Sequence, residues 1–250
     1  MQKKMLKTDL NPSKKHLDNI EEWLIEEDNK SNEGFYHHWS MISNAFDEKR
    51  LIIITKNDYA IGFVIYNIFD LTAKIDIAEI KPIERKKGIA KKLINGTLEY
   101  FKAKGILVTE LFCSPENSEP FWKKVGFINF PKTINYGQIK MYRPTITCLD
   151  RRISATTNKN VIQLWESHNT EKELPKYVWE LEFENQTKKL IKPIILPVSG
   201  DWYISINLYG NELIKTKVKR VRDFDIYYGG FLIITELNPM KTQSTTTPIK

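Results

Sequence analysis

The sequence contains few cysteines and no long apolar run. Its two cysteines, Cys113 and Cys148, are too few for a disulfide framework and do not have the spacing of metal ligands. No apolar stretch approaches the ~20 residues that span a bilayer, and the charged N-terminus is not followed by the apolar core of a secretory signal. These absences argue against a disulfide-rich secreted scaffold and a membrane partner, and they favour a cytoplasmic location without a bound metal.

The chain also lacks a concentrated block of charge. Its formal net charge is +7 over 250 residues, and the excess of Lys and Arg is shared between the two halves of the sequence. A nucleic-acid-binding protein usually gathers its basic residues into an arm or onto one face. The charge distribution therefore does not favour nucleic acid as a partner.

The first 145 residues change their hydrophobic period several times. Apolar residues recur at helical spacing near the N-terminus, then in strand-like runs, and the two patterns alternate after that. The predicted helices cover 14–28, 35–48, 89–103 and 118–125, and the predicted strands cover 51–55, 60–66, 73–81, 106–113 and a closing hairpin within 127–143. This order predicts an α/β fold with a strand–helix–strand crossover, which places an anion site at a strand end.

The rest of the chain has a different pattern. A polar stretch without periodicity lies near 145–160, and short β-type runs separated by turn residues follow it. We therefore expect a first domain at 1–146, a linker at 147–160, a smaller and mostly antiparallel β domain at 161–238, and a disordered tail at 239–250.

The most informative segment joins a strand to a helix and has the sequence Ile80-Lys-Pro82-Ile-Glu-Arg85-Lys86-Lys87-Gly88-Ile89-Ala90. The N-terminus of a helix presents unpaired backbone N–H groups and the positive end of the helix dipole. Three basic residues and a glycine at such a turn suit a phosphate or pyrophosphate, because glycine lets the backbone approach closely.

A second motif follows at the expected distance. The segment Phe121-Trp122-Lys-Lys-Val-Gly126-Phe127 comes after the next predicted strand and closes a short helix. With Arg85-x-x-Gly88-x-Ala90 and the order of elements, it resembles the GNAT superfamily of N-acetyltransferases over residues 1–144. The resemblance is to a family, and its implications for fold and chemistry are expectations.

The resemblance implies acetyl-CoA as the acyl donor. In the family, the segment matching Arg85, Lys86, Lys87, Gly88, Ile89 and Ala90 wraps the pyrophosphate, and the backbone matching Ile80, just before Pro82, pairs with pantetheine. The asparagine that usually faces the cofactor is replaced by Pro115, and Asn117 is the nearest substitute. The implied reaction transfers an acetyl group to a primary amine of a small molecule or protein by direct attack in a ternary complex.

The resemblance also suggests which residues act on protons. Asp76 and Glu79 lie on the strand before the loop and are candidates for the base, and Glu79 breaks the strand alternation as at a bulge. Many family members have a tyrosine acid where this chain has Trp122, and an indole N–H is no such acid at neutral pH. Tyr136 or Tyr142 on the closing hairpin, or water, would then protonate the leaving thiolate.

Several alternatives remain open at this point. The first domain could be a catalytically weak CoA-binding protein, or an enzyme that acetylates a protein bound by the β domain, and a homodimer is possible. His37 and His38 fit either an acceptor wall or an inert helix surface. Alternating lysines at 215, 217 and 219 fit either an anion-binding surface or the protection of an edge strand.

Overall fold

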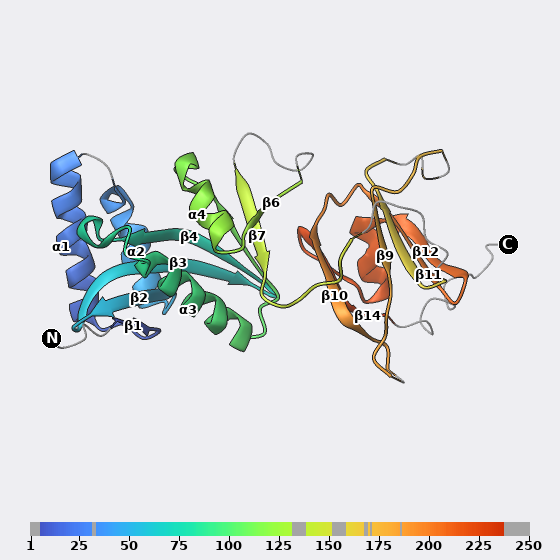
Figure 1. Cartoon of the computed structure of the whole chain (residues 1–250), viewed down its shortest axis with the longest axis horizontal. Coiled ribbons are helices and arrows are strands. Elements are labelled where there is room, and N and C mark those ends of the chain that lie inside the picture. Colours follow the sequence, from blue (N-terminus) through green and yellow to red (C-terminus); the bar gives the residue numbers. More distant parts are fainter. Residues whose placement is uncertain are drawn as a thin grey trace. The chain divides into compact units, whose positions relative to one another are not determined.

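A computed structural model of the chain describes residues 6–31, 34–131, 139–151, 159–167, 170, 172–185 and 187–237 (Figure 1). Its contacts divide the chain into two compact units, with the main boundary between Ile146 and Thr147. The predicted tail at 239–250, residues 152–158 of the predicted linker, and Tyr136 lie outside the described residues.

The first unit contains a seven-stranded mixed sheet of order β1-β2-β3-β4-β5-β7-β6. Only the β4–β5 pair among these neighbours is parallel. Its strands are β1 (Leu6–Asp9), β2 (Leu51–Lys56), β3 (Tyr59–Phe69), β4 (Thr72–Ile80), β5 (Val108–Phe112), β6 (Ile128–Asn129) and β7 (Lys140–Pro144). Its helices are α1 (Lys14–Ser31), α2 (Trp39–Asp47), α3 (Ile89–Ala103) and α4 (Glu119–Lys124), with 3-10 turns η1 (Tyr36–His38), η2 (Pro82–Glu84) and η3 (Glu116–Ser118). The mixed sheet with helices is the predicted fold class, and β1 is a strand that the sequence did not indicate.

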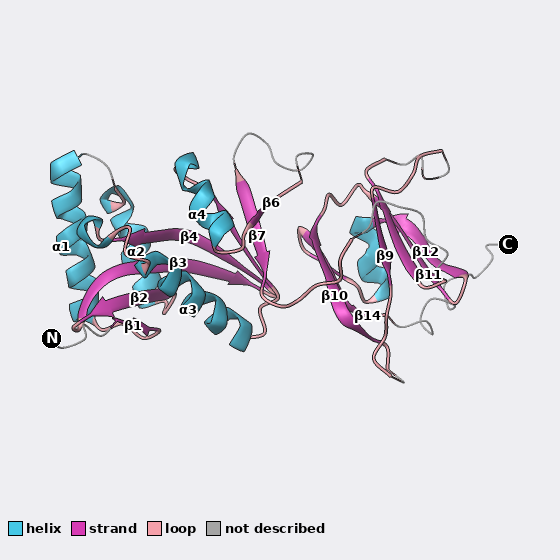
Figure 2. Cartoon of the chain, in the orientation of Figure 1, coloured by secondary structure: helices cyan, strands magenta, loops and turns pink. Residues whose placement is uncertain are grey.

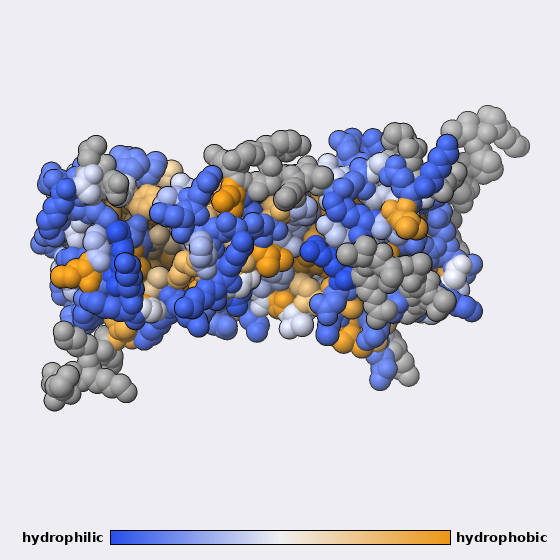
Figure 3. Space-filling model, turned by 45° about the horizontal axis from the view of Figure 1, so that its top comes forward, coloured by the Kyte–Doolittle hydropathy of each residue, from blue (hydrophilic) through white to orange (hydrophobic). Residues whose placement is uncertain are grey.

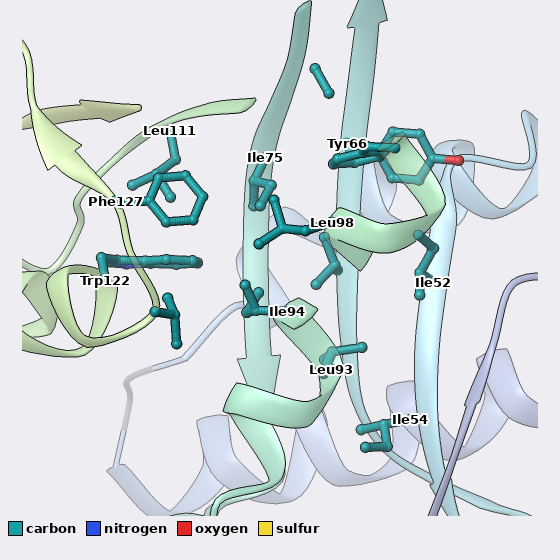
Figure 4. Close-up of a cluster of buried hydrophobic side chains, with 14 of the residues drawn as sticks. Ile52, Ile54, Tyr66, Ile75, Leu93, Ile94, Leu98, Leu111, Trp122 and Phe127 are labelled. Atoms are coloured by element: carbon teal, nitrogen blue, oxygen red, sulfur yellow. The ribbon is translucent and has the colours of Figure 1, made fainter. Parts of the chain in front are cut away.

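Helices cover both faces of this sheet, and each face has its own apolar core (Figure 2). The apolar stripe of α1 packs with residues of α2 and with one face of β2, β3 and β4, around the fully buried Trp23 and Phe63. The opposite face packs against α3 and α4, and Figure 4 shows part of that cluster, including Leu93, Ile94 and Trp122. Burying side chains of this size stabilises a fold by about 1.5–3 kcal/mol each.

A bulge changes the face that β4 presents along its length. Ile75 pairs with Tyr66 and Ile77 pairs with Ile65, so Asp76 is the extra residue on β4. As a result Ile75 packs in the α3 core whereas Ile77, two residues later, packs in the α1 core. The break in alternation at Glu79 suggested a bulge at that residue, and this expectation was wrong because the extra residue is Asp76.

The second unit consists of two antiparallel sheets, of orders β10-β14-β13 and β12-β11-β8-β9, around one apolar core. Its elements are β8 (Val161–Trp165), β9 (Tyr177–Glu180), β10 (Lys189–Pro197), β11 (Tyr203–Leu208), β12 (Asn211–Lys217), the 3-10 segment η5 (Val218–Phe224), β13 (Tyr227–Tyr228) and β14 (Phe231–Glu236). The run of alternating lysines is not one strand, because β12 ends at Lys217 and Lys219 lies in η5. Both of these lysines contact the carboxylate of Asp201.

The surface shows no continuous apolar belt on the face in view. Figure 3 shows mostly hydrophilic residues there, with hydrophobic residues in small separate groups. Among the described helices, none is both long enough and apolar enough to cross a membrane.

Candidate active site

A cavity of about 530 Å³ lies where β4 and β5 separate. The two strands pair only from Thr72 to Ile75 on β4, and the next neighbour of β5 is β7. Residues Asp76–Ile80 therefore have a partner strand on one side only, and all five line the cavity. The other walls come from η1 and α2, the start of α3, and the segment from Leu111 to Trp122.

The loop before α3 presents free backbone donors. Lys86 and Gly88 adopt left-handed conformations with φ of 63° and 78°, which turns the chain into the helix. Within the described part of the chain, the N–H groups of residues 86–91 donate to no acceptor, and no side chain caps the helix. Unpaired N–H groups at a helix N-terminus form an anion site. The geometry therefore fits the predicted pyrophosphate cradle.

Side chains at the start of this loop form ion pairs that fix the loop to β2 and to itself. Pro82 begins the exposed turn η2, and Glu84 in that turn contacts Lys56 and, at 3.1 Å, Lys87. These two amino groups lower the pKa of the Glu84 carboxyl below its usual value. Lys86 and Lys87 are exposed at the loop surface, whereas Ile89 is buried in the α3 core and Ala90 lines the cavity.

Arg85 is at the centre of a charged cluster beside the cavity. Its Nη2 donates to Glu27 Oε1 on α1 at 2.6 Å and to Glu79 Oε1 at 3.1 Å, and its Nε donates to the Ile80 carbonyl at 3.0 Å. The Ile80 N–H donates to Glu79 Oε1 at 2.7 Å. The Lys81 N–H donates to Ile61 on β3, so the Ile80 backbone groups point to the open side of β4. Glu79 and Arg85 thus already bond to the Ile80 N–H and carbonyl, which are the groups predicted to pair with pantetheine.

Glu79 is a largely buried carboxylate, with 16% of its side chain exposed, and its neighbours act on its pKa in opposite directions. Burial raises the pKa of Glu79 above its ordinary value, Arg85 and the Ile80 N–H lower it, and the nearby Glu27 carboxylate raises it. The net direction is upward. A carboxyl group with a raised pKa is a stronger proton acceptor once ionised, as a general base requires.

The other candidate base, Asp76, is already paired. Asn67 Nδ2 donates to one carboxylate oxygen at 2.6 Å, and Lys74 Nζ lies 2.9 Å from the other. Asp76 lines the cavity, but an amino group and an amide already compensate its charge. The structure therefore brings both candidate bases to one cavity and gives them different environments.

Of the residues expected near the bound cofactor and its sulfur, only some line the cavity. Trp122 lines the cavity with its ring beside Phe127 and pointing toward Ile94 (Figure 4). Tyr142 is buried in β7 against Phe130 and does not line the cavity. Asn117 is exposed in η3 and is also outside the lining, whereas its neighbour Ser118 is part of it.

The wall next to α2 is apolar and aromatic. Phe35, His38 and Met41 line it. The His38 ring lies 4.0 Å from that of His37, and burial, with a smaller effect of His37, lowers the pKa of His38. The lowered pKa favours the neutral form of the imidazole, and His38 adds a polar group to this wall.

Glu27 is a cluster member that the sequence motifs did not indicate. It belongs to no family motif, and the sequence of α1 indicates an apolar stripe that includes Leu17, Ile20 and Leu24. Glu27 continues that stripe at helical spacing, and its side chain is 9% exposed. A carboxylate at the end of a buried stripe was the available signal, because such a group needs a charged partner.

Part of the chain is similar to known proteins. Residues 15–127 match the model of the acetyltransferase (GNAT) family. The chain is similar to the paia N-acetyltransferase of Thermoplasma acidophilum, solved with coenzyme A, at 19% identity and a TM-score of 0.46 over 56% of this chain and 99% of that one.

Two further solved structures are similar. A GNAT-family acetyltransferase of Bacillus cereus has 19% identity and a TM-score of 0.45 over 57% of this chain and 99% of its own. The ribosomal-protein-S18-alanine N-acetyltransferase of Escherichia coli has 15% identity and a TM-score of 0.41 over 58% and 96%. No curated protein matches the chain. On the family match, residues 15–127 of this chain form a domain of the acetyltransferase (GNAT) family.

Proposed function

We propose that the protein transfers an acetyl group from acetyl-CoA to a primary amine by direct attack in a ternary complex. The single observation that carries this proposal is the cavity between β4 and β5, which joins a helix N-terminus with unpaired N–H groups to a buried carboxylate. GNAT acetyltransferases use acetyl-CoA, and bound acetyl-CoA supplies the acetyl group as a thioester that a neutral amine can attack.

The loop before α3 is the proposed pyrophosphate site. The N–H groups of residues 86–91 would bind the phosphate oxygens, and Lys86 and Lys87 add positive charge at the exposed edge. Arg85 contributes less to the phosphates, because its guanidinium is held by Glu27 and Glu79.

The pantetheine contact at Ile80 requires a rearrangement. Its N–H and C=O already bond to Glu79 and Arg85, so both side chains must release the backbone before another strand-like group can pair there. The exchange replaces two hydrogen bonds with two others, so its net cost is small compared with leaving these groups unpaired. It also frees Glu79 Oε1 from the Ile80 N–H.

Glu79 is the proposed base. An amine substrate arrives mostly as an ammonium ion, and Glu79 would accept its proton directly or through a water molecule and then pass it to solvent. Asp76 is less suited because Asn67 and Lys74 hold both of its oxygens. Since Trp122 cannot donate a proton and Tyr142 lies outside the cavity, we assign protonation of the leaving sulfur to water.

Two glycines that flank α3 provide a matched test of the cofactor site. Gly88 and Gly105 flank the helix with φ of 78° and 77°, and a Cβ at either position would meet no atom within 4 Å. Gly88→Glu and Gly105→Glu should therefore destabilise the protein equally. The cost is about 1–2 kcal/mol, because a residue with a Cβ would have to adopt the left-handed conformation. Only Gly88→Glu places a carboxylate at the proposed pyrophosphate site, where like charges repel.

Calorimetry with acetyl-CoA and thiol release across a panel of primary amines would measure the two effects. We expect Gly88→Glu to abolish both binding and amine-dependent thiol release, and Gly105→Glu to retain both. Equal binding by the two variants would refute the cofactor site. Binding of acetyl-CoA without thiol release for any amine would instead support a catalytically silent CoA-binding protein.

A further inference from the structure

The charged cluster has one more carboxylate than the proposed chemistry uses. Glu27 is on α1, far from the loop and strand motifs in sequence, yet its Oε1 accepts from Arg85 Nη2 at 2.6 Å. Its Oε2 is buried and has no hydrogen-bond partner among the described residues. A buried carboxylate costs free energy unless it is paired, and Arg85 is the charged partner that compensates Glu27.

The same Arg85 nitrogen serves two carboxylates. Nη2 bridges Glu27 and Glu79, while Nε holds the Ile80 carbonyl. If pantetheine takes the Ile80 backbone, as the proposed function requires, Glu27 is the anchor that keeps the guanidinium beside Glu79. We propose that Glu27 is a positioning residue that acts through Arg85, so that α1 controls how readily Glu79 accepts the substrate proton.

The direction of this control follows from the charges around Glu79. Arg85 contacts Glu79, and Glu27 lies close enough to raise its pKa. Asp76 and His38 line the same cavity. The negative charge of Glu27 disfavours ionisation of Glu79. Because Glu27 also pairs with Arg85, it weakens the stabilisation that Arg85 gives to the Glu79 anion. Glu27→Gln keeps an oxygen that can accept from Arg85 but removes the charge. The pKa of Glu79 should therefore fall, and transfer should begin at a lower pH.

The control is the neighbouring residue on the same helix. Glu26 is half-exposed and lies 3.9 Å from Lys30 on the surface of α1. Glu26→Gln makes the same chemical change and has the same effect on net charge, without touching Arg85. Thermal unfolding of both variants would show that they are folded.

Two measurements test the inference separately from the proposed function. Carbon-13 NMR of the labelled Glu side chains in the protein without acetyl-CoA would follow the titration of Glu79, with the resonance assigned through Glu79→Gln. The midpoint should fall by about half a unit or more in Glu27→Gln and stay in place in Glu26→Gln. The acid limb of the pH profile of kcat/KM should shift by the same amount.

An unchanged Glu79 midpoint in Glu27→Gln overturns the inference, whether or not the protein releases thiol. A midpoint that moves while the acid limb stays would overturn control of transfer by α1 and remove Glu79 as the base. Failure of the proposed function has a different signature, because wild-type protein would then release no thiol with any amine while the NMR comparison still reported on Glu27.

Discussion

At the residue scale, the two candidate bases of this site differ in how many of their carboxylate oxygens are held by neighbours. Asp76 and Glu79 are three positions apart, and the sequence made both of them candidates for the base. The bulge at Asp76 and the contacts of Asn67 and Lys74 distinguish them. Lys74 is two positions from Asp76, but the bulge and the contact with Asn67 depend on the pairing of β3 with β4, which no local pattern predicts. Glu79 obtains its raised pKa from burial, which depends on the whole fold.

Trp122 provides a prediction at the same scale. Its ring packs against Phe121 and Phe127 in the core, and it also lines the cavity. Trp122→Ala should destabilise the protein by about 3–5 kcal/mol. Trp122→Phe should cost less and leave kcat almost unchanged, because an indole N–H is not a proton donor to a thiolate at neutral pH. Urea unfolding and thiol release would measure the two effects. A loss of more than tenfold in kcat for a stable Trp122→Phe protein would assign a catalytic role to the indole.

At the element scale, the period of the apolar residues predicted most helices and strands of the first unit. The pattern failed where strand length or pairing decided the structure. β1 has one apolar residue in four and exists because β2 pairs with it, and the alternating lysines end their strand early because η5 begins at Val218. The loop before α3 was predictable because its donors are backbone groups fixed by the helix start. Glu27 was missed because its partners come from a distant loop.

The close approach of β3 and β4 at the cavity gives an element-scale prediction. A Cβ on Gly62 would lie 2.4 Å from Ile80 Cδ1 and 2.9 Å from the Glu79 carbonyl oxygen. Gly62→Ala should therefore push β4 outward, destabilise the fold by about 1–3 kcal/mol and weaken acetyl-CoA binding. Ile80→Val removes the Cδ1 atom, so the double variant should recover part of both losses. Urea unfolding and calorimetry would test this, and double-variant losses equal to the sum of the single losses would contradict the steric explanation.

At the scale of the whole molecule, each compact unit has its own apolar core. The first unit has two apolar cores, which are formed by residues of its own sheet and helices. The core of the second unit is formed by residues after Ile146. The predicted boundary near 146 therefore remains a proposal with a physical basis, since a chain of that length can bury enough surface to fold alone.

A fragment test follows from this division. We expect residues 1–146, expressed alone, to unfold cooperatively and to bind acetyl-CoA as the full chain does, because every described residue lining the cavity belongs to the first unit. Near-UV circular dichroism and calorimetry would measure the two properties. A fragment with secondary structure but no near-UV signal would show that the second unit is needed for the packing of the first.

The hydrogen bonds to Ile80 have a consequence beyond the reaction. Where β4 separates from β5, the sheet has an internal open edge, and an extended segment of another polypeptide could add to such an edge as a new strand. Glu79 and Arg85 cover the Ile80 donor and acceptor with charged side chains of the same chain. Strand addition at Ile80 would therefore first have to displace these two side chains, so in this arrangement they hinder the pairing of another polypeptide at this point of the edge.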